Sequence, residues 1–183
     1  MKRKTAKEIL AESFRELAEA KSIDKITVKD IVANCGYSQA TFYRQFKDKY
    51  DLIAWDYAQS VASVMNRVGQ NGYPWKQTLI DGAQNFHDSR NYLSNLLKHT
   101  EGHESFIRYM SEINFEALKQ HIQKANGAEP LSEMLVMYIR LYCLGTVCLA
   151  CEWILEKYQT SAEELAEIFL QSLPEPLHPY LLQ

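Results

Sequence analysis

The side chains best suited to chemistry lie in a short segment, residues 38–49. At helical spacing, one stripe of this segment carries amide, phenol and cationic groups around one small residue; its members are Gln39, Ala40, Tyr43, Arg44 and Lys47. Amide and guanidinium groups can pair with base edges in DNA, and a small residue permits close approach. Phe42 and Phe46, one turn apart, fall on the opposite face. The segment therefore predicts an amphipathic helix whose polar face fits a groove of a duplex.

Two further helices are predicted to hold this one in place. Thr5-Ala-Lys-Glu8 and Thr27-Val-Lys-Asp30 are capping boxes that start helices, and Asn34-Cys-Gly36 ends the second of them. Ser38 then caps the third helix. Two short helices around a turn form a helix-turn-helix, and its second helix is expected to enter the major groove.

A longer pattern contains this segment. It runs from Ile26-Thr-Val through Cys35-Gly36-Tyr37-Ser38 to Thr41-Phe42-Tyr43, Phe46-Lys47 and Lys49. This pattern resembles the N-terminal domain of the TetR/AcrR family of transcription regulators. Two positions depart from the family: Arg44 stands where an aromatic residue is frequent, and Gln45 stands where many members have histidine.

The resemblance implies roles for individual residues. Thr27, Tyr43 and Lys49 match positions that contact phosphate, and Gln39, Ala40 and Thr41 match positions that face bases. A glutamine can also pair bidentately with adenine, and an arginine prefers guanine. The alternatives are that Tyr43 packs on the first helix and that Arg44 is merely solvated. The predicted DNA-binding set is Thr27, Ser38, Gln39, Ala40, Thr41, Tyr43, Arg44, Lys47 and Lys49.

The charge is divided unevenly along the chain. The net charge is -3 overall, but residues 1–50 hold 11 Lys and Arg against 7 Asp and Glu, and residues 51–183 hold 9 against 16. A positive head attracts phosphate, and a negative body repels it. The asymmetry points to an oriented nucleic-acid partner, and ordinary surface scatter is the alternative that charge alone leaves open.

The composition points to the cytoplasm. The N-terminus lacks the apolar run of a signal peptide, and four cysteines are few for a disulfide scaffold. The most apolar stretch, residues 134–155, is interrupted by Arg140 and Glu152, so we expect a buried helix and no membrane span. Buried thiols are favoured over a redox or zinc site at Cys143, Cys148 and Cys151.

The chain is predicted to be all-α, with about nine helices. Apolar residues recur at helical spacing along its whole length. A three-helix DNA-binding domain, residues 1–49, is expected to precede a helical bundle for dimerisation and sensing, residues 50–183. The proline-rich tail, residues 173–183, is expected to be partly ordered at best.

The second half offers two functional surfaces. Long apolar helices at residues 131–158 and 161–173 would need covering on both sides, which a homodimer provides. The candidate dimer residues are Leu135, Tyr138, Gly145, Leu149, Trp153, Ile168 and Phe169. A sensor pocket could be lined by aromatic and methionine side chains, although these are also typical core residues; the candidates are Trp75, Phe86, Tyr92, Phe106, Tyr109, Met110 and Tyr142.

The second half also resembles, more weakly, a subgroup that includes activators of dihydroxyacetone kinase operons. The resemblance lies in Tyr73-Pro-Trp75, Phe86, Asn91-Tyr92-Leu93 and Phe106. It implies a small metabolite or a partner protein as the signal.

These patterns predict a homodimeric transcription regulator, either repressor or activator, that binds double-stranded operator DNA. No nucleophile elbow, glycine-rich phosphate loop or zinc-protease motif is found, so we expect no enzyme, cofactor or metal. The alternative is an all-helical protein-interaction adaptor without DNA binding. A salt-sensitive gel shift distinguishes the two, because an adaptor would show none at physiological salt.

Overall fold

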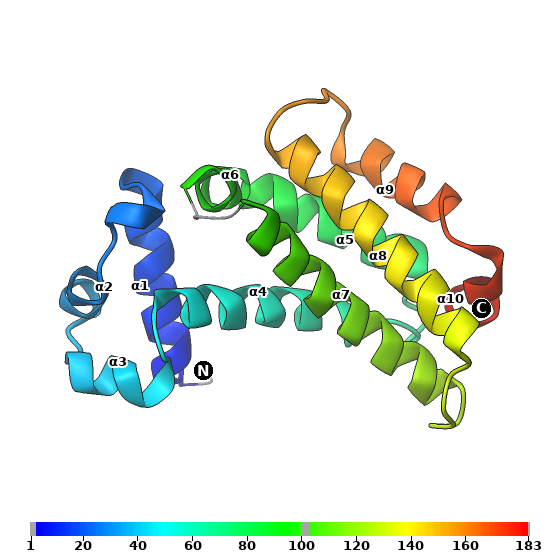
Figure 1. Ribbon diagram of the computed structural model, residues 1–183, viewed down its shortest axis with the longest axis horizontal. Helices are drawn as coiled ribbons and strands as arrows, with labels where there is room; N and C mark the ends of the chain where they lie inside the picture. Colours follow the sequence, from blue (N-terminus) through cyan, green and yellow to red (C-terminus); the bar gives the residue numbers. More distant parts are fainter. Residues whose placement is uncertain (1–2, 100–102, 183) are drawn as a thin grey trace.

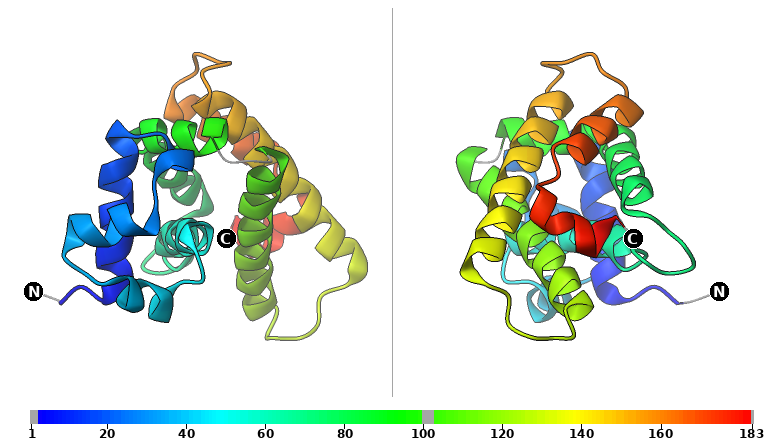
Figure 2. Two further views of the ribbon diagram at one scale, coloured as in Figure 1. Left: turned by 60° about the vertical axis from the view of Figure 1, so that its left-hand side comes forward. Right: turned by 90° about the vertical axis from the view of Figure 1, so that its right-hand side faces the viewer.

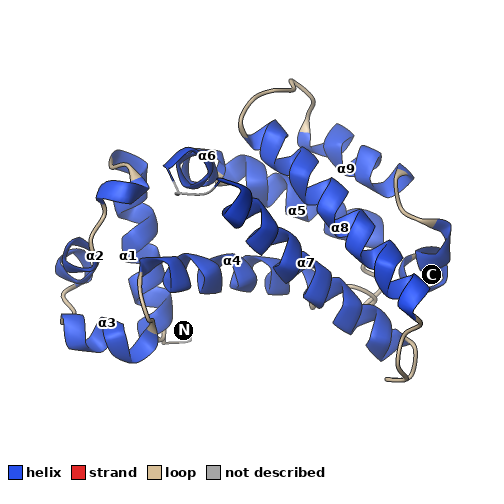
Figure 3. Ribbon diagram, in the orientation of Figure 1, coloured by secondary structure: helices blue, strands red, loops and turns tan. Residues whose placement is uncertain are grey.

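The computed structural model describes residues 3–99 and 103–182, and over these residues the chain is built from helices without strands (Figures 1 and 3). The all-α prediction is confirmed. In chain order the elements are α1 (Ala6–Ala20), η1 (Ile23–Lys25), α2 (Val28–Cys35), α3 (Gln39–Gln45), α4 (Lys49–Met65), α5 (Trp75–Asp88), α6 (Arg90–His99), α7 (His103–Ala125), α8 (Glu133–Ile154), α9 (Ala162–Gln171), η2 (Glu175–Leu177) and α10 (His178–Leu181).

The helix starts follow the predicted caps. Thr5, Thr27 and Ser161 each close a reciprocal capping box with the acidic residue three positions later. The Ser38 side chain accepts the Thr41 N–H and starts α3. Gly36 ends α2 at a φ of 72°, a left-handed conformation that glycine adopts without a Cβ penalty. Local chemistry therefore sets the bounds of the helix-turn-helix.

Helix α4 links two parts of the molecule (Figure 1). Helices α1–α3 gather at one end, and α4 runs from them into the bundle of α5 and α7–α9. Figure 2 shows α4 nearly end-on between α1 and α7, and both helices pack against it. The same apolar core includes Leu10 and Phe14 of α1, Phe42 of α3, Leu52 of α4 and Trp153 of α8. A movement of α4 would consequently reach both parts.

The C-terminal tail is ordered over residues 173–182, and the prediction for it is wrong there. Leu177 and Leu181, four residues apart, are buried in a second core cluster with Ile139 of α8. The His178 Nε2 lies 3.1 Å from the Leu173 carbonyl oxygen. Prolines are tolerated at the first turn of a helix, so Pro176 and Pro179 start η2 and α10 rather than preventing them. These two elements and η1 account for the helical structure beyond the predicted set.

Helix α8 carries an uncovered apolar stripe. By length and composition alone it could span a membrane: its most apolar window has a mean hydropathy of 1.8, and 33% of that window is buried. Met134, Met137, Leu141 and Leu144 are all exposed, and their spacing of three and four places them on one face. Such a face is stable in water only when another surface covers it.

Candidate nucleic-acid interface and sensor pocket

Helix α3 lies at one end of the molecule (Figure 1). Gln39, Ala40, Tyr43, Arg44 and Lys47 are all exposed, and 57% of the Tyr43 surface remains accessible. The structure thus leaves the predicted groove-facing stripe open to solvent. The Tyr43 and Phe42 rings form an edge-to-face contact, with their centroids 5.5 Å apart.

The opposite face of α3 is anchored in the core. Phe42 and Phe46 are almost wholly buried, and their ring centroids lie 5.8 Å apart. Phe46 also packs edge-on against Trp55 of α4 at 5.8 Å. Aromatic contacts of this kind fix ring orientation as well as position. The polar stripe is therefore held on a rigid support.

A polar network fixes α2 against α1. The buried Ser13 hydroxyl donates to the Ile31 carbonyl oxygen at 2.7 Å, and Asn34 Nδ2 donates to the Ser13 oxygen at 3.1 Å and to Glu16 at 2.9 Å. A buried hydroxyl that both donates and accepts is fully satisfied. Sequence reasoning missed this network, because Ser13 and Asn34 are ordinary surface residues in a helical pattern.

The hydroxyl groups of Thr27 and Thr41 already have partners. Thr27 donates to the Asp30 carboxylate at 2.8 Å and accepts its N–H. The Thr27 backbone N–H, the Lys21 ammonium and the Thr27 hydroxyl all donate to the Asp30 carboxylate and hold its pKa down at about 2. The Thr41 hydroxyl lies 3.0 Å from that of Ser38 and accepts from the Arg44 guanidinium at 3.2 Å. Arg44 is thus oriented along α3 with its other donors exposed.

The Lys49 ammonium group binds backbone carbonyl oxygens of its own chain, whereas the family resemblance implies a contact with phosphate. Its ammonium donates to three carbonyl oxygens, those of Ile23 at 2.8 Å, Ile26 at 2.9 Å and Asp24 at 3.1 Å. An ammonium has three donors, so this set is complete. Partial burial lowers the pKa of Lys49. We infer that Lys49 braces the turn between α1 and α2, a proposed correction to the phosphate contact that the family resemblance implies.

Lys49→Gln tests this correction. We expect a loss of about 1.5–3 kcal/mol in the free energy of unfolding, because charge-assisted hydrogen bonds are lost. The salt dependence of DNA binding should keep its slope, since no phosphate contact disappears. Chemical denaturation and titrations at several salt concentrations measure both quantities. A stable variant with a flatter salt dependence would restore the phosphate role.

Two polar contacts tie the helix-turn-helix to the rest of the chain. Arg15 of α1 forms a bidentate ion pair with Asp56 of α4, which is 4% exposed. Asn95 of α6 caps the end of α1 and the following turn: its amide nitrogen donates to the Ala18 and Lys21 carbonyl oxygens at 2.7 and 3.0 Å. Sequence reasoning missed both, because the partners are separated by 41 or more residues.

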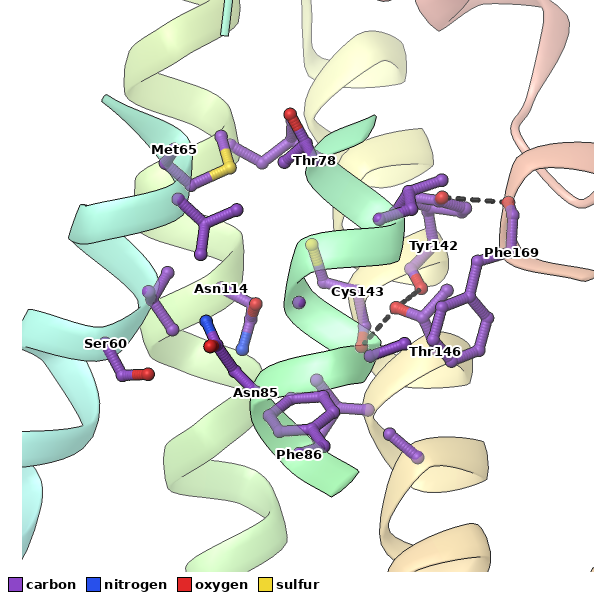
Figure 4. Close-up of a pocket in the computed structure, with 18 of the residues that line it drawn as sticks. Ser60, Met65, Thr78, Asn85, Phe86, Asn114, Tyr142, Cys143, Thr146 and Phe169 are labelled. Carbon is purple, nitrogen blue, oxygen red and sulfur yellow. Dashed lines mark hydrogen bonds between the residues drawn. The ribbon is translucent and has the colours of Figure 1, made fainter. Parts of the chain in front are cut away.

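A partly open cavity of about 110 Å³ lies between α4, α5, α7, α8 and α9 (Figure 4). Three predicted pocket residues line it: Trp75, Phe86 and Tyr142. Several polar liners were missed, since scattered Asn, Ser and Thr give no periodic signal; they are Tyr57, Ser60, Asn85, Asn114 and Thr146. Burial raises the pKa of the Cys143 thiol in its wall to about 12.

The other predicted pocket residues lie elsewhere. Phe106 and Met110 are buried in the core, and Tyr109 is exposed at the surface. Tyr92 borders a neighbouring crevice, where its buried hydroxyl lies beside Asp56 without a hydrogen-bond partner among the described residues. Aromatic composition alone does not distinguish residues that line a pocket from residues of the hydrophobic core.

The predicted dimer residues divide between surface and interior. Gly145 and Ile168 are exposed, and Leu135, Tyr138 and Leu149 are half-buried against the protomer's own core. Trp153 and Phe169 are buried, and the Trp153 indole donates to the Thr160 carbonyl oxygen at 2.8 Å. These two residues were wrongly assigned to a surface. The exposed stripe lies one residue away, at Met134, Met137, Leu141, Leu144 and Cys148.

The cysteines and histidines form no cluster with metal-ligand geometry within the described part of the chain. Cys143 and Cys151 are buried and Cys148 is exposed, all as free thiols. Burial raises the pKa of Cys151 to about 12, which keeps that thiol protonated.

An exposed polar helix on a helix-turn-helix support, followed by a helical bundle with a cavity, defines the class of helix-turn-helix transcription regulators. Family models agree over both parts. Residues 9–54 match the model described as bacterial regulatory proteins, tetR family, and residues 74–175 match a transcriptional regulator C-terminal region. The chain belongs to the tetR family and is a DNA-binding transcriptional regulator.

A curated relative supports the same placement. The HTH-type dhaKLM operon transcriptional activator DhaS of Lactococcus lactis is 26% identical over 72 residues. That match covers 39% of this chain and 38% of the relative's length, so well under half of DhaS is spanned.

Solved structures share the fold over nearly the whole chain. A dihydroxyacetone kinase operon activator, DhaS, superposes with a TM-score of 0.69 at 17% identity, covering 96% of this chain and 98% of its own. A regulator from Streptococcus agalactiae gives 0.62 at 14% identity, with 93% and 94% covered. FadR from Bacillus subtilis, in complex with stearoyl-CoA, gives 0.55 at 16% identity, with 93% and 98% covered.

Proposed function

We propose that this regulator binds operator DNA as a homodimer through the outer face of α3 and that a ligand in the α4–α9 cavity sets its affinity. The exposed stripe of Gln39, Tyr43, Arg44 and Lys47 carries the proposal. Gln39 and Arg44 can reach base edges, and Lys47 and Tyr43 can reach phosphates. Ser38, Ala40 and Thr41 shape the same N-terminal end of α3, and Ala40 leaves room for a base.

The apolar stripe on α8 supports the dimer. The stripe offers an apolar surface to a second copy, and Ile168 of α9, which is 42% exposed, is a further apolar side chain open to contact. A two-fold pair of such faces buries each stripe against its mate. The family reads DNA through paired recognition helices, and two-fold symmetry matches a pseudo-palindromic site. The stripe then belongs to an interface and not to a membrane span, and we assign the protein to the cytoplasm.

Helix α4 supports the regulation. Tyr57 lines the cavity, and the preceding residue, Asp56, holds Arg15 of α1. A ligand that shifts α4 would therefore pull on the helix-turn-helix, which changes the spacing of the two recognition helices. We place the division between the DNA-binding and sensing parts at residues 49–50, where α4 begins.

Gln39→Ala tests base reading by α3. We expect discrimination to relax at one base pair of each half-site by about 1–3 kcal/mol, or roughly 5- to 150-fold, because one bidentate contact to adenine is lost. Fragments selected from genomic DNA would supply the operator. Competition titrations against all four bases at each position then measure the effect.

The matched control is Gln59→Ala, an exposed glutamine on α4 away from α3. It should leave the base preference unchanged. An unaltered preference in Gln39→Ala, with tight operator binding, would remove Gln39 from the reading set. A protein that binds no duplex at physiological salt would instead support the adaptor alternative.

A further inference from the structure

The cavity between α4, α5, α7, α8 and α9 has a distinct chemical character. Of the described residues that line it, none is charged: the wall consists of aliphatic, aromatic, hydroxyl, amide and thiol groups. An ion transferred into such a wall would lose its hydration without a counter-charge. The cavity is therefore suited to a neutral occupant.

Three hydrogen-bonding side chains lie at one end of the cavity. In Figure 4, Ser60, Asn85 and Asn114 are drawn on the side of α4, away from Tyr142 and Phe169. At the far end, the Tyr142 hydroxyl already donates to the Phe169 carbonyl oxygen at 2.9 Å. Elsewhere in the wall, the hydroxyls of Thr78 and Thr146 donate to backbone carbonyl oxygens, and the Trp75 indole N–H has no partner among the described residues. The remaining wall is mainly apolar. An occupant would thus meet polar groups at one end and an apolar surface along its body.

Tyr57 and Asn114 form the centre of the polar end. Asn114 Nδ2 donates to the Tyr57 hydroxyl oxygen at 2.7 Å and to the Met110 carbonyl oxygen at 2.9 Å. A carbonyl can only accept, so this contact fixes which end of the Asn114 amide is nitrogen. Within the described chain, the Tyr57 proton and the Asn114 Oδ1 have no partner. One donor and one acceptor therefore lie side by side.

A hydroxyl group complements this pair. It can accept from the Tyr57 O–H and donate to Asn114 Oδ1 at the same time. A carboxylate could accept from Tyr57 but would face the Asn114 oxygen without a proton to share. Burial raises the pKa of Tyr57, so its phenol remains a donor at every physiological pH.

The size of the cavity limits the body of the occupant. A cavity of about 150 Å³ in another protein holds one benzene ring, and this one measures about 110 Å³. A crevice of about 360 Å³ shares Tyr57, Ser60, Asn85 and Phe86 with it and provides a route from solvent. A single ring, or an aliphatic group of similar volume, therefore fits with small movements of the wall.

We propose that the effector site of this regulator selects a small neutral molecule of about one ring in size that carries a hydroxyl group, held between Tyr57 and Asn114. This proposal rests on the proposed function only in calling the cavity an effector site. Its binding test needs no DNA.

Fluorine NMR on the full-length protein with three probes of one ring tests the proposal. We expect para-fluorophenol to bind most tightly, fluorobenzene to bind roughly 2- to 10-fold more weakly for each missing hydrogen bond, and para-fluorobenzoate to bind least. Equal or tighter binding of para-fluorobenzoate would overturn the proposal. The absence of binding by all three probes would overturn it as well.

Variants locate the binding. Gly82 lines the cavity, and a Cβ built there meets no atom within 4 Å, so the side chain of Gly82→Leu can enter the cavity and should abolish probe binding. Gly82→Ala, which gains the same helical propensity with far less volume, is the matched control. Probe binding that survives Gly82→Leu would place the site elsewhere and overturn the assignment.

Tyr57→Phe should weaken the binding of para-fluorophenol by roughly 2- to 10-fold and leave the binding of fluorobenzene unchanged. Tyr142→Phe removes a hydroxyl that is already used within the protein, so it should affect both probes alike. Equal effects of Tyr57→Phe on both probes would contradict the pairing with Tyr57.

Operator titration of the same samples tests the proposed function separately. DNA binding without probe binding would contradict only the assignment of the cavity. Probe binding that leaves operator affinity unchanged would contradict only the proposed regulation.

Discussion

Leu141→Glu is expected to convert the dimer into monomers and to abolish operator binding at concentrations that saturate the native protein. Leu141 lies in the middle of the apolar stripe on α8, with 66% of its surface exposed in the protomer. Two-fold symmetry places both new carboxylates at the same interface. Each buried ion costs several kcal/mol, so a penalty of at least about 4 kcal/mol per dimer raises the dissociation constant roughly 1,000-fold.

Analytical ultracentrifugation over a concentration series measures the dimer, and a gel shift measures DNA binding. Tyr109→Glu is the matched control, because Tyr109 is a large exposed residue on a different helix, α7. The monomer should retain its helical content, since Leu141 makes little contact within its own protomer. A Leu141→Glu protein that remains dimeric would place the interface on another face.

Arg15→Met is expected to lower the free energy of unfolding by about 2–4 kcal/mol. The Arg15 side chain is half-exposed but Asp56 is buried, so removing the guanidinium leaves a buried carboxylate without compensation. Asp56 is 4% exposed, and the Arg15 guanidinium supplies both of its hydrogen bonds from α1. The nearby Tyr92 hydroxyl could donate one bond in compensation, which would bring the loss toward the lower end of this range.

The double variant Arg15→Met with Asp56→Asn separates charge from packing. It removes the orphaned carboxylate while keeping the shape of the side chain, so it should recover most of the lost stability. Urea denaturation of both variants and of Asp56→Asn alone gives the coupling energy. A loss below about 1 kcal/mol in Arg15→Met would mean that Asp56 is not buried in solution.

Capping chemistry allowed the helix-turn-helix to be predicted from the sequence. The side chains of Thr5, Thr27 and Ser38 accept backbone N–H groups and so start their helices. Gly36 ends α2 in a left-handed backbone conformation that costs other residues free energy. Phe42 and Phe46 could be assigned to the core from the sequence, because they lie opposite the polar stripe of α3. In such segments, short-range chemistry and the helical period agree.

The dimer surface and the pocket could not be derived in the same way. Helix α8 is apolar around most of its circumference, so its period does not show which side packs inward, and the assigned face was one residue away from the exposed stripe. Trp153 of α8 was placed outside for that reason. The cavity liners Tyr57, Asn85 and Asn114 come from three helices, and only tertiary packing brings them together.

Lys49 shows why a family role does not transfer without geometry. Its position matches a phosphate contact, but three carbonyl oxygens surround its ammonium group. The three carbonyl oxygens converge because of the backbone path of the turn between α1 and α2. That path cannot be predicted from the pattern of residue types.

The salt dependence of operator binding tests the central claim most directly. Replacing Arg44 and Lys47 by Gln removes four cations from the α3 faces of a dimer, so the plot of log K against log salt should become less steep by up to roughly 3.6. The same replacement at Lys119 and Lys124 of α7 should leave the slope unchanged. An unaltered slope and affinity in the α3 variant would show that this face does not meet DNA.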